Sequence, residues 1–230
     1  MTDWHAFTFC GASLVALPTG SLWWPATRTL TVSDLHLGKS ARIARRSGTF
    51  LPPYETGDTL ARLASDIALT DPARVICLGD SFDDLQAARD LPSSDHATLA
   101  SLQAGRQWVW IEGNHDPGPV AVGGAHHAEF ALGPLTFRHI ATEASAEVSG
   151  HFHPKYGLQG AGPARACFIY DQTRLILPAF GTYTGGLHCD TPVIRDLFGP
   201  APVAVLTGSK AIAIPVTKIQ RGRRFRGRSY

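Results

Sequence analysis

The stretch Val75-Ile76-Cys77-Leu78-Gly79-Asp80 joins an apolar run to a carboxylate, and the fold can be inferred outward from it. Four consecutive apolar residues are typical of a short strand that is buried on both faces of a sheet. Gly79 allows a tight turn directly after this strand, which would place Asp80 at its carboxyl end. Loops that leave this end of a rigid sheet converge, so α/β proteins form ligand sites there.

Three further polar clusters follow apolar, strand-like runs in the same way. The runs are 29–32, 108–111 and 146–148, and the clusters are Asp34-Leu35-His36, Gly113-Asn114-His115-Asp116 and Gly150-His151-Phe152-His153. Asp, His and Asn side chains all bind divalent metals. We expect Asp34 and His36 to bind one ion together, because residues two apart in an extended segment point the same way. Asp80 has two carboxylate oxygens and is the candidate to bridge two ions about 3.5–4 Å apart.

Length and composition predict one folded domain over residues 1–220. The chain has 230 residues, of which 44% are apolar and 17% charged, as in a soluble globular protein. Its apolar runs fall short of the ~20 residues that cross a bilayer, and its first residues lack a signal-peptide pattern. We therefore expect a cytoplasmic protein without a membrane partner. The four cysteines are far apart in sequence, so neither a zinc cage nor a disulfide framework is expected.

The last ten residues, 221–230, form a basic Arg/Gly tail with five arginines and no acid. Subtracting these five charges from the net charge of +2 leaves about −3 on the rest of the chain. A basic tail on a slightly acidic body favours a polyanionic partner such as nucleic acid, although a solvated tail that aids solubility is an alternative.

The order of the expected elements indicates a mixed α/β fold. Strands are expected at 5–10, 12–17, 27–32, 75–78 and 107–112, and helices at 40–46, 54–69 and 95–104. After Asp116 the pattern changes to short strands at about 125–132, 134–139, 145–149, 164–170, 174–177, 203–207 and 211–215. The first half is thus β/α and the second mainly antiparallel. A four-layer αββα sandwich of two mixed β-sheets with flanking helices satisfies both halves.

His115 is expected to take part in catalysis without binding metal, because it points differently from its neighbour Asn114 in a turn. It can stabilise or protonate a departing alkoxide, and Asp83 is expected to orient and charge it. Asp84 and Asp116 are alternatives for that orienting role. The expected nucleophile is a metal-bridging hydroxide that attacks phosphorus in line.

The ordered motifs Asp34-x-His36, Gly79-Asp80-x-x-Asp83, Gly113-Asn114-His115-Asp116 and Gly150-His151-x-His153 resemble those of the calcineurin-like metallophosphoesterases. The resemblance implies an αββα sandwich with two metal ions and an Asp83–His115 dyad. It also implies the two ligand sets, which are Asp34, His36, Asp80 and His153 for one ion, and Asp80, Asn114, His139 and His151 for the other. Ligands of this kind without thiolate favour Mn²⁺, with Fe, Zn or Co as alternatives.

The family has one further histidine between its third and last motifs. His139 is the expected counterpart because it ends the strand-like run 135–138, and His126 and His127 are its rivals.

A closer resemblance is to the bacterial ligase-associated DNA-damage-response nucleases. It rests on the stretches 33–39, 78–82, 138–139, 150–154 and 177–187. It implies manganese-dependent phosphodiesterase or single-strand endonuclease activity in DNA repair. Members of that group are encoded beside a DNA ligase and a helicase, which the resemblance implies as partners. His188-Cys189 departs from that group's pattern.

Two segments are expected to contact the substrate. Lys39 and Arg42, with Arg45 and Arg46, follow the first metal motif and can contact phosphates, although a solvated helix face is an alternative. Thr182, Tyr183 and Thr184 lie in the glycine-containing 178–187 loop and can contact substrate through their hydroxyls. An open groove with cations would indicate a phosphodiesterase. The alternatives are a phosphomonoesterase for a protein or small molecule, and a metal-poor scaffold without activity.

Overall fold

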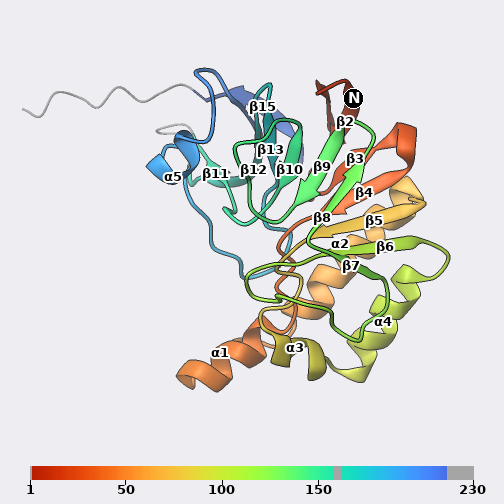
Figure 1. Cartoon of the computed structure of the whole chain (residues 1–230). Helices are drawn as coiled ribbons and strands as arrows, with labels where there is room; N and C mark the ends of the chain where they lie inside the picture. The colour runs from red at the N-terminus through yellow and green to blue at the C-terminus, as the bar shows by residue number, and fades with distance from the viewer. Residues whose placement is uncertain (1, 158–161, 217–230) are drawn as a thin grey trace, which may run out of the picture.

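The computed structural model describes residues 2–157 and 162–216, which form two mixed β-sheets flanked by helices (Figure 1). The sandwich class expected from the sequence is confirmed. The expected basic tail at 221–230 lies outside the described residues.

The first sheet has the strand order β1-β2-β3-β4-β5-β6-β7. Neighbouring strands are antiparallel from β1 to β4 and parallel from β4 to β7. The carboxyl ends of β4, β5 and β6 therefore lie at one edge. Its strands are β1 (His5–Phe9), β2 (Ala12–Ala16), β3 (Leu22–Trp24), β4 (Thr29–Val32), β5 (Arg74–Leu78), β6 (Gln107–Ile111) and β7 (Ala125–His127).

The second sheet has the strand order β15-β14-β12-β13-β10-β9-β8, with β11 beside β12. Strands β9, β10 and β13 run parallel to one another, so their carboxyl ends also share an edge. The strands are β8 (Glu129–Leu132), β9 (Leu135–Arg138), β10 (Glu147–Ser149), β11 (Lys155–Tyr156), β12 (Arg165–Tyr170), β13 (Arg174–Ile176), β14 (Val203–Leu206) and β15 (Ile212–Pro215).

The helices lie mainly on the outer face of the first sheet, and α5 covers part of the second (Figure 1). They are α1 (Lys39–Ser47), α2 (Glu55–Thr70), α3 (Leu85–Arg89), α4 (Ser93–Gln103) and α5 (Pro192–Arg195), with a 3₁₀ turn, η1, at Pro25–Thr27. The fourth layer of the sandwich is thus thin. Within the described residues, we find no helix with the length and apolarity needed to cross a bilayer.

Strand β6 explains how the layers are held together. Val109 and Ile111 point into the core between the two sheets, whereas Trp108 and Trp110 pack against the helices. Both faces of the strand are therefore buried, as its uninterrupted apolar sequence predicts. On the helix side, Leu60 of α2 belongs to the same apolar cluster as these tryptophans.

Two expected elements differ from the structure. The strand expected at 27–32 begins at Thr29, because residues 25–27 form the 3₁₀ turn η1. The single strand expected at 125–132 is two strands that belong to different sheets. Strand β7 pairs with β6, and β8 pairs with β9. The chain crosses from one sheet to the other at Ala128, a change that hydrophobic periodicity does not reveal.

Candidate metal centre

The site forms where the carboxyl-terminal edges of the two sheets meet. The first sheet contributes Asp34 and His36 after β4, Asp80 after β5 and Asn114 after β6. The second sheet contributes His139 after β9, and His151 and His153 after β10. Hydrogen bonds join the edges; for example, His139 contacts the Leu78 carbonyl at 2.8 Å and the His151 N–H contacts Asp34 at 3.0 Å.

The seven residues expected to bind metal lie in two adjoining groups. Asp34, His36 and His153 present ligand atoms within 4.8 Å of one another, and Asp80, His139 and His151 do the same. The Asn114 Oδ1 atom lies 2.9 Å from His139 Nε2 and so joins the second group. His139 also connects the groups, because its ring nitrogens lie 3.4 Å from Asp80 and 4.0 Å from Asp34.

The backbone at these positions is unusual. Asp34, His36, Asp80, His151 and His153 all have positive φ angles, between 44° and 68°. Residues 34–36 are therefore not extended, contrary to the expectation from their spacing. The two side chains still meet, but through left-handed turns. Such conformations cost about 1–3 kcal/mol each and are typical of functional sites that the surrounding fold holds in place.

Glycines allow the two edges to approach closely. A Cβ atom on Gly79 would collide with the ring of His139, and one on Gly150 would collide with Ser33 and Asp34. These two glycines are therefore needed for space at the junction of the sheets.

The histidines are oriented as metal ligands usually are. The Nδ1–H of His139 donates to the Leu78 carbonyl, so Nε2 is the ring atom directed at the cluster and would bind a metal once it is deprotonated. His36 Nδ1 lies 2.8 Å from Asp83 Oδ1, and its Nε2 atom is buried without a hydrogen-bond partner among the described residues. A buried polar atom in this state fits a ligand for an ion. Nitrogen and oxygen donors without thiolate suit a borderline divalent metal.

The electrostatics of the cluster keep its carboxylates ionised. Burial alone would raise the pKa of Asp80, but hydrogen bonds from His139 and from the His115 N–H lower it to about 2. Burial would likewise lower the pKa of His139, yet the facing carboxylates of Asp80 and Asp34 raise it to about 8. The negative charge of the two aspartates is what a divalent cation would neutralise.

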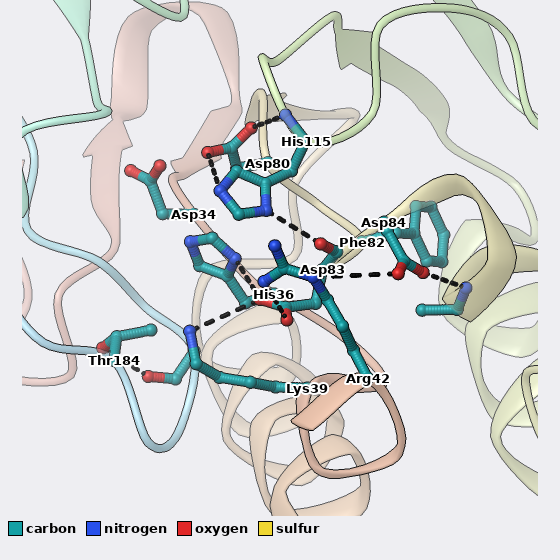
Figure 2. A network of polar contacts seen from close by, with 12 residues as sticks. Asp34, His36, Lys39, Arg42, Asp80, Phe82, Asp83, Asp84, His115 and Thr184 are labelled. Carbon is teal, nitrogen blue, oxygen red and sulfur yellow. Dashed lines mark hydrogen bonds and ion pairs between the residues drawn. The ribbon is translucent and has the colours of Figure 1, made fainter. Parts of the chain in front are cut away.

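The expected Asp83–His115 dyad differs from the structure. His115 Nδ1 donates to the main-chain carbonyl of Asp83 at 2.8 Å, not to its carboxylate. The carboxylate turns instead to His36, to Arg42 at 2.9 Å and to Lys39 at 3.4 Å (Figure 2). Although burial opposes ionisation, these three partners hold the pKa of Asp83 well below its usual range. Asp83 therefore positions His115 through its backbone.

The two alternatives for that orienting role also point elsewhere. Asp84 caps α3 by accepting from the Ala87 N–H at 2.7 Å, and it pairs with Arg45. Asp116 is buried and accepts main-chain N–H groups from four residues, which are Asp80, Ser81, Phe82 and Gly113. Burial raises the pKa of Asp116 to about 6, and the Asp80 charge adds to the shift. The motif spacing did not predict that Asp116 would hold the turn at Asp80.

His126 and His127 were the rivals of His139 for the second group of candidate ligands. His126 and His127 lie in β7, where His126 stacks on Trp110 and His127 packs against Phe130. Neither belongs to the ligand groups, so the structure brings the third candidate, His139, to the cluster.

The three hydroxyls of the 178–187 loop that were expected to contact substrate donate hydrogen bonds to other groups of the protein. Thr182 donates to Asp58 of α2 at 2.5 Å, and Thr184 donates to the Gly181 carbonyl at 2.8 Å. Tyr183 donates to the Pro52 carbonyl at 3.4 Å.

Fold and site together define a two-sheet α/β sandwich with a cluster of aspartate, histidine and asparagine at its joined edges. No protein-family model and no curated protein matches this chain. Among solved structures, the chain is similar to the crystal structure of Pseudomonas putida nuclease MPE, with a TM-score of 0.72 and 29% sequence identity. The alignment covers 93% of this chain and 100% of that chain.

Proposed function

We propose that this chain is a metal-dependent phosphodiesterase that cuts nucleic acid, with two divalent ions bound at the candidate metal centre. The observation that carries the proposal is the pair of ligand groups that adjoin at the junction of the two sheets. The similarity to the Pseudomonas putida nuclease supports a nucleic-acid substrate, because it extends over 93% of this chain.

Each ion would have four protein ligands. They would be Asp34, His36, Asp80 and His153 for one ion, and Asp80, Asn114, His139 and His151 for the other. We propose Mn²⁺ as the metal, with Fe, Zn and Co as the alternatives to test. When bound, such a pair of ions would polarise a phosphoryl group and lower the pKa of water to about 7.

His115 would serve as the proton donor to the departing oxygen. Because its Nδ1 is bonded to the Asp83 carbonyl, Nε2 is the atom directed toward Asp80, from which it lies 4.0 Å. The side chain is 27% exposed, so a substrate can reach it. A proton held at Nε2 would stabilise a poor leaving group more than a good one.

Lys39 and Arg42 would contact the substrate phosphates. Each side chain is 19% exposed, and the buried Asp83 carboxylate holds both in place. Cations that are fixed before substrate arrives lose little entropy on binding it. An open hollow, lined by Arg138 and by the acidic Glu112 and Glu129, also lies beside Asn114 and His139. Its openness, not its charge, favours a polymer over a monoester held in a closed pocket.

We further propose that the enzyme cuts single-stranded DNA endonucleolytically during DNA repair, and that it acts in association with a DNA ligase and a helicase. The motif resemblance described above supports it, as do the five arginines at 221–230.

The test is hydrolysis of bis-p-nitrophenyl phosphate by metal-stripped protein reloaded with Mn²⁺. The variant Asp80→Asn should lose at least about 100-fold in turnover, because an amide cannot bridge two cations as a carboxylate does. Asp196→Asn is the matched control, since Asp196 is exposed and pairs with Arg195 beyond the site. Full turnover by Asp80→Asn would refute the two-metal proposal. Faster hydrolysis of p-nitrophenyl phosphate than of the diester would favour the phosphomonoesterase alternative.

A further inference from the structure

Two tyrosines from distant parts of the chain meet at the surface. The ring centroids of Tyr54 and Tyr183 lie 6.0 Å apart, with an angle of 54° between the ring planes. Tyr54 is 61% exposed, and Tyr183 is partly exposed. Tyrosine is enriched at interfaces because its ring is apolar and its hydroxyl is polar, so this tilted pair outside the core is a candidate binding surface.

The Tyr183 ring is carried by a loop that is fixed to both halves of the metal centre. At one end, the Gly181 N–H donates to the Asp34 carbonyl at 3.1 Å. At the other end, the Leu187 N–H donates to the Phe152 carbonyl at 3.4 Å, between His151 and His153. Tyr183 therefore lies two residues after Gly181, whose N–H is bonded to the candidate ligand Asp34.

Tyr54 is attached to the site through the start of α2. The next residue, Glu55, accepts from the Ser40 N–H at 3.0 Å, and Thr56 accepts from the Gly38 N–H at 2.9 Å. These bonds fix the start of α1, the helix that carries the proposed phosphate contacts. Both rings thus belong to segments that are bonded to the site.

The backbone of Tyr183 has a positive φ of 64°. A turn of this shape would be formed at lower cost by glycine, because a Cβ atom destabilises the left-handed region by about 1–2 kcal/mol. The Tyr183 phenol is uncharged at neutral pH, because the ordinary pKa of a tyrosine is about 10 and the neighbouring Tyr54 raises the pKa of Tyr183 to about 12. An uncharged ring does not repel a phosphate chain.

We propose that Tyr183 and Tyr54 form a stacking site for an unpaired nucleobase of the strand whose phosphodiester lies at the metal centre. The inference rests on the proposed function and adds a subsite to it. Base–aromatic stacking is tolerant of sequence because every base has a π face. In a duplex the faces of the bases are covered by their neighbours, so this site would favour single-stranded substrate.

The experiment compares two oligomers with the same sugar-phosphate backbone. One is a single-stranded oligothymidylate, and the other is a base-free oligomer of tetrahydrofuran spacers. Binding to the Ca²⁺-loaded full-length protein is measured by fluorescence anisotropy, and cutting by the Mn²⁺-loaded protein is measured separately. Tyr183→Ala should weaken binding and kcat/KM for oligothymidylate by about 10-fold, the loss of one stacked base. It should leave the base-free oligomer unchanged within about 2-fold.

Two variants serve as controls. Tyr183→Phe keeps the ring and should retain wild-type values, which separates stacking from the hydroxyl contact to Pro52. Trp4→Ala removes a 42% exposed aromatic beside Thr70, at the other end of α2, and should have no effect. The metal content and melting temperature of each variant confirm that the site is intact.

The proposal is overturned if Tyr183→Ala weakens both oligomers equally, if it weakens neither, or if Tyr183→Phe loses as much as Tyr183→Ala. A wild-type protein that binds oligothymidylate more tightly than the base-free oligomer, and loses this preference in Tyr183→Ala, supports the stacking site even without turnover. Absence of turnover on any diester would instead be a failure of the proposed hydrolase.

Discussion

At the scale of single residues, Asp83 connects the candidate ligands to the candidate substrate contacts. Its buried carboxylate accepts from His36 on one side and from Arg42 and Lys39 on the other. Removing the charge would loosen the orientation of His36, leave Lys39 without its carboxylate partner and leave Arg42 with Asp84 alone. Metal binding and substrate binding are therefore expected to change together.

Asp83→Asn should lower the affinity for Mn²⁺ by about 10–100-fold, the usual effect of losing the group that orients a metal-binding histidine. It should also raise KM for a phosphodiester, because Arg42 and Lys39 are released. Calorimetric titration of metal-stripped protein and steady-state kinetics measure the two effects. Asp84→Asn is the control for the metal affinity, since Asp84 pairs with Arg45 and Arg42 but contacts no candidate ligand. Unchanged Mn²⁺ affinity in Asp83→Asn would contradict this role.

His115→Asn should retain the metal and slow the reaction according to the leaving group. With a poor leaving group such as an alkoxide, we expect a loss of about 10²–10⁴-fold, and with p-nitrophenolate a much smaller one. The measurement is kcat for a series of aryl and alkyl esters, with metal content checked in parallel. A loss of equal size across the series would argue against proton donation.

Spacing and residue type predict which side chains gather at the site, but not which of their atoms meet. His139 was chosen over His126 and His127 because it follows a strand end, and it is the one that joins the cluster. The partner of His115 was not predictable in this way. Whether a histidine contacts the carboxylate or the main-chain carbonyl of Asp83 depends on turn geometry that spacing does not specify.

At the scale of elements, the loops after β4 and β10 must pack without a side chain between them. Gly150→Ala would place a methyl group against Ser33 and Asp34. We expect it to destabilise the protein by about 1–3 kcal/mol, as overpacking of a buried contact does, and to lower the bound metal. Thermal unfolding and metal analysis test this. Normal metal content in Gly150→Ala would show that the loops can separate without harm to the site.

Gly57→Ala is the matched substitution on the surface of α2. An added Cβ atom there meets nothing within 4 Å, and the backbone has no positive φ. Alanine should stabilise the protein by about 0.4–1 kcal/mol, because it restricts the conformational freedom of the unfolded chain more than glycine does. A higher melting temperature with unchanged metal content is the expected result, and a lower melting temperature would contradict it.

The sequence predicted the three longer helices α1, α2 and α4, but not the short helices α3 and α5. The helix expected at 54–69 is α2, and Leu60, Leu63 and Ile67 of its expected apolar stripe are buried, whereas Ala64 is half-buried. Strand ends were less predictable, because residues 125–132 change sheets at Ala128 without any break in their pattern. Sheet membership depends on partners that lie far away in sequence.

At the scale of the whole molecule, the two sheets bring the ligand loops together because each contains a run of neighbouring parallel strands. Strands β4, β5 and β6 end at one edge, and β9, β10 and β13 end at the facing edge. The sequence predicts two mixed sheets from its change of pattern. It does not predict that their carboxyl-terminal edges face each other, since this follows from how the sheets pack.

The stability of the whole fold should depend on the charge of Asp66, which is buried on α2 away from the metal centre. Burial raises the pKa of Asp66 above its ordinary value of 3.8, and the hydrogen bonds from Ser21 and Thr19 offset part of this effect. The folded state therefore holds the Asp66 proton more tightly than the unfolded state does. As pH rises from about 3.8 through the raised pKa, stability contributed by the protonated form is lost.

Asp66→Asn should remove this pH dependence, because the neutral amide can still accept from Ser21 and Thr19 but does not ionise. Its melting temperature should exceed that of the wild type at pH 7, and the difference should shrink toward pH 4. Asp71→Asn, at the exposed end of the same helix, is the control and should show no such trend. The measurement is thermal unfolding of the three proteins between pH 4 and pH 8. If the melting temperature of the wild type instead rose relative to that of Asp66→Asn as pH increased, the ionised carboxylate would be the stabilising form. Its hydrogen bonds would then outweigh the cost of burying its charge.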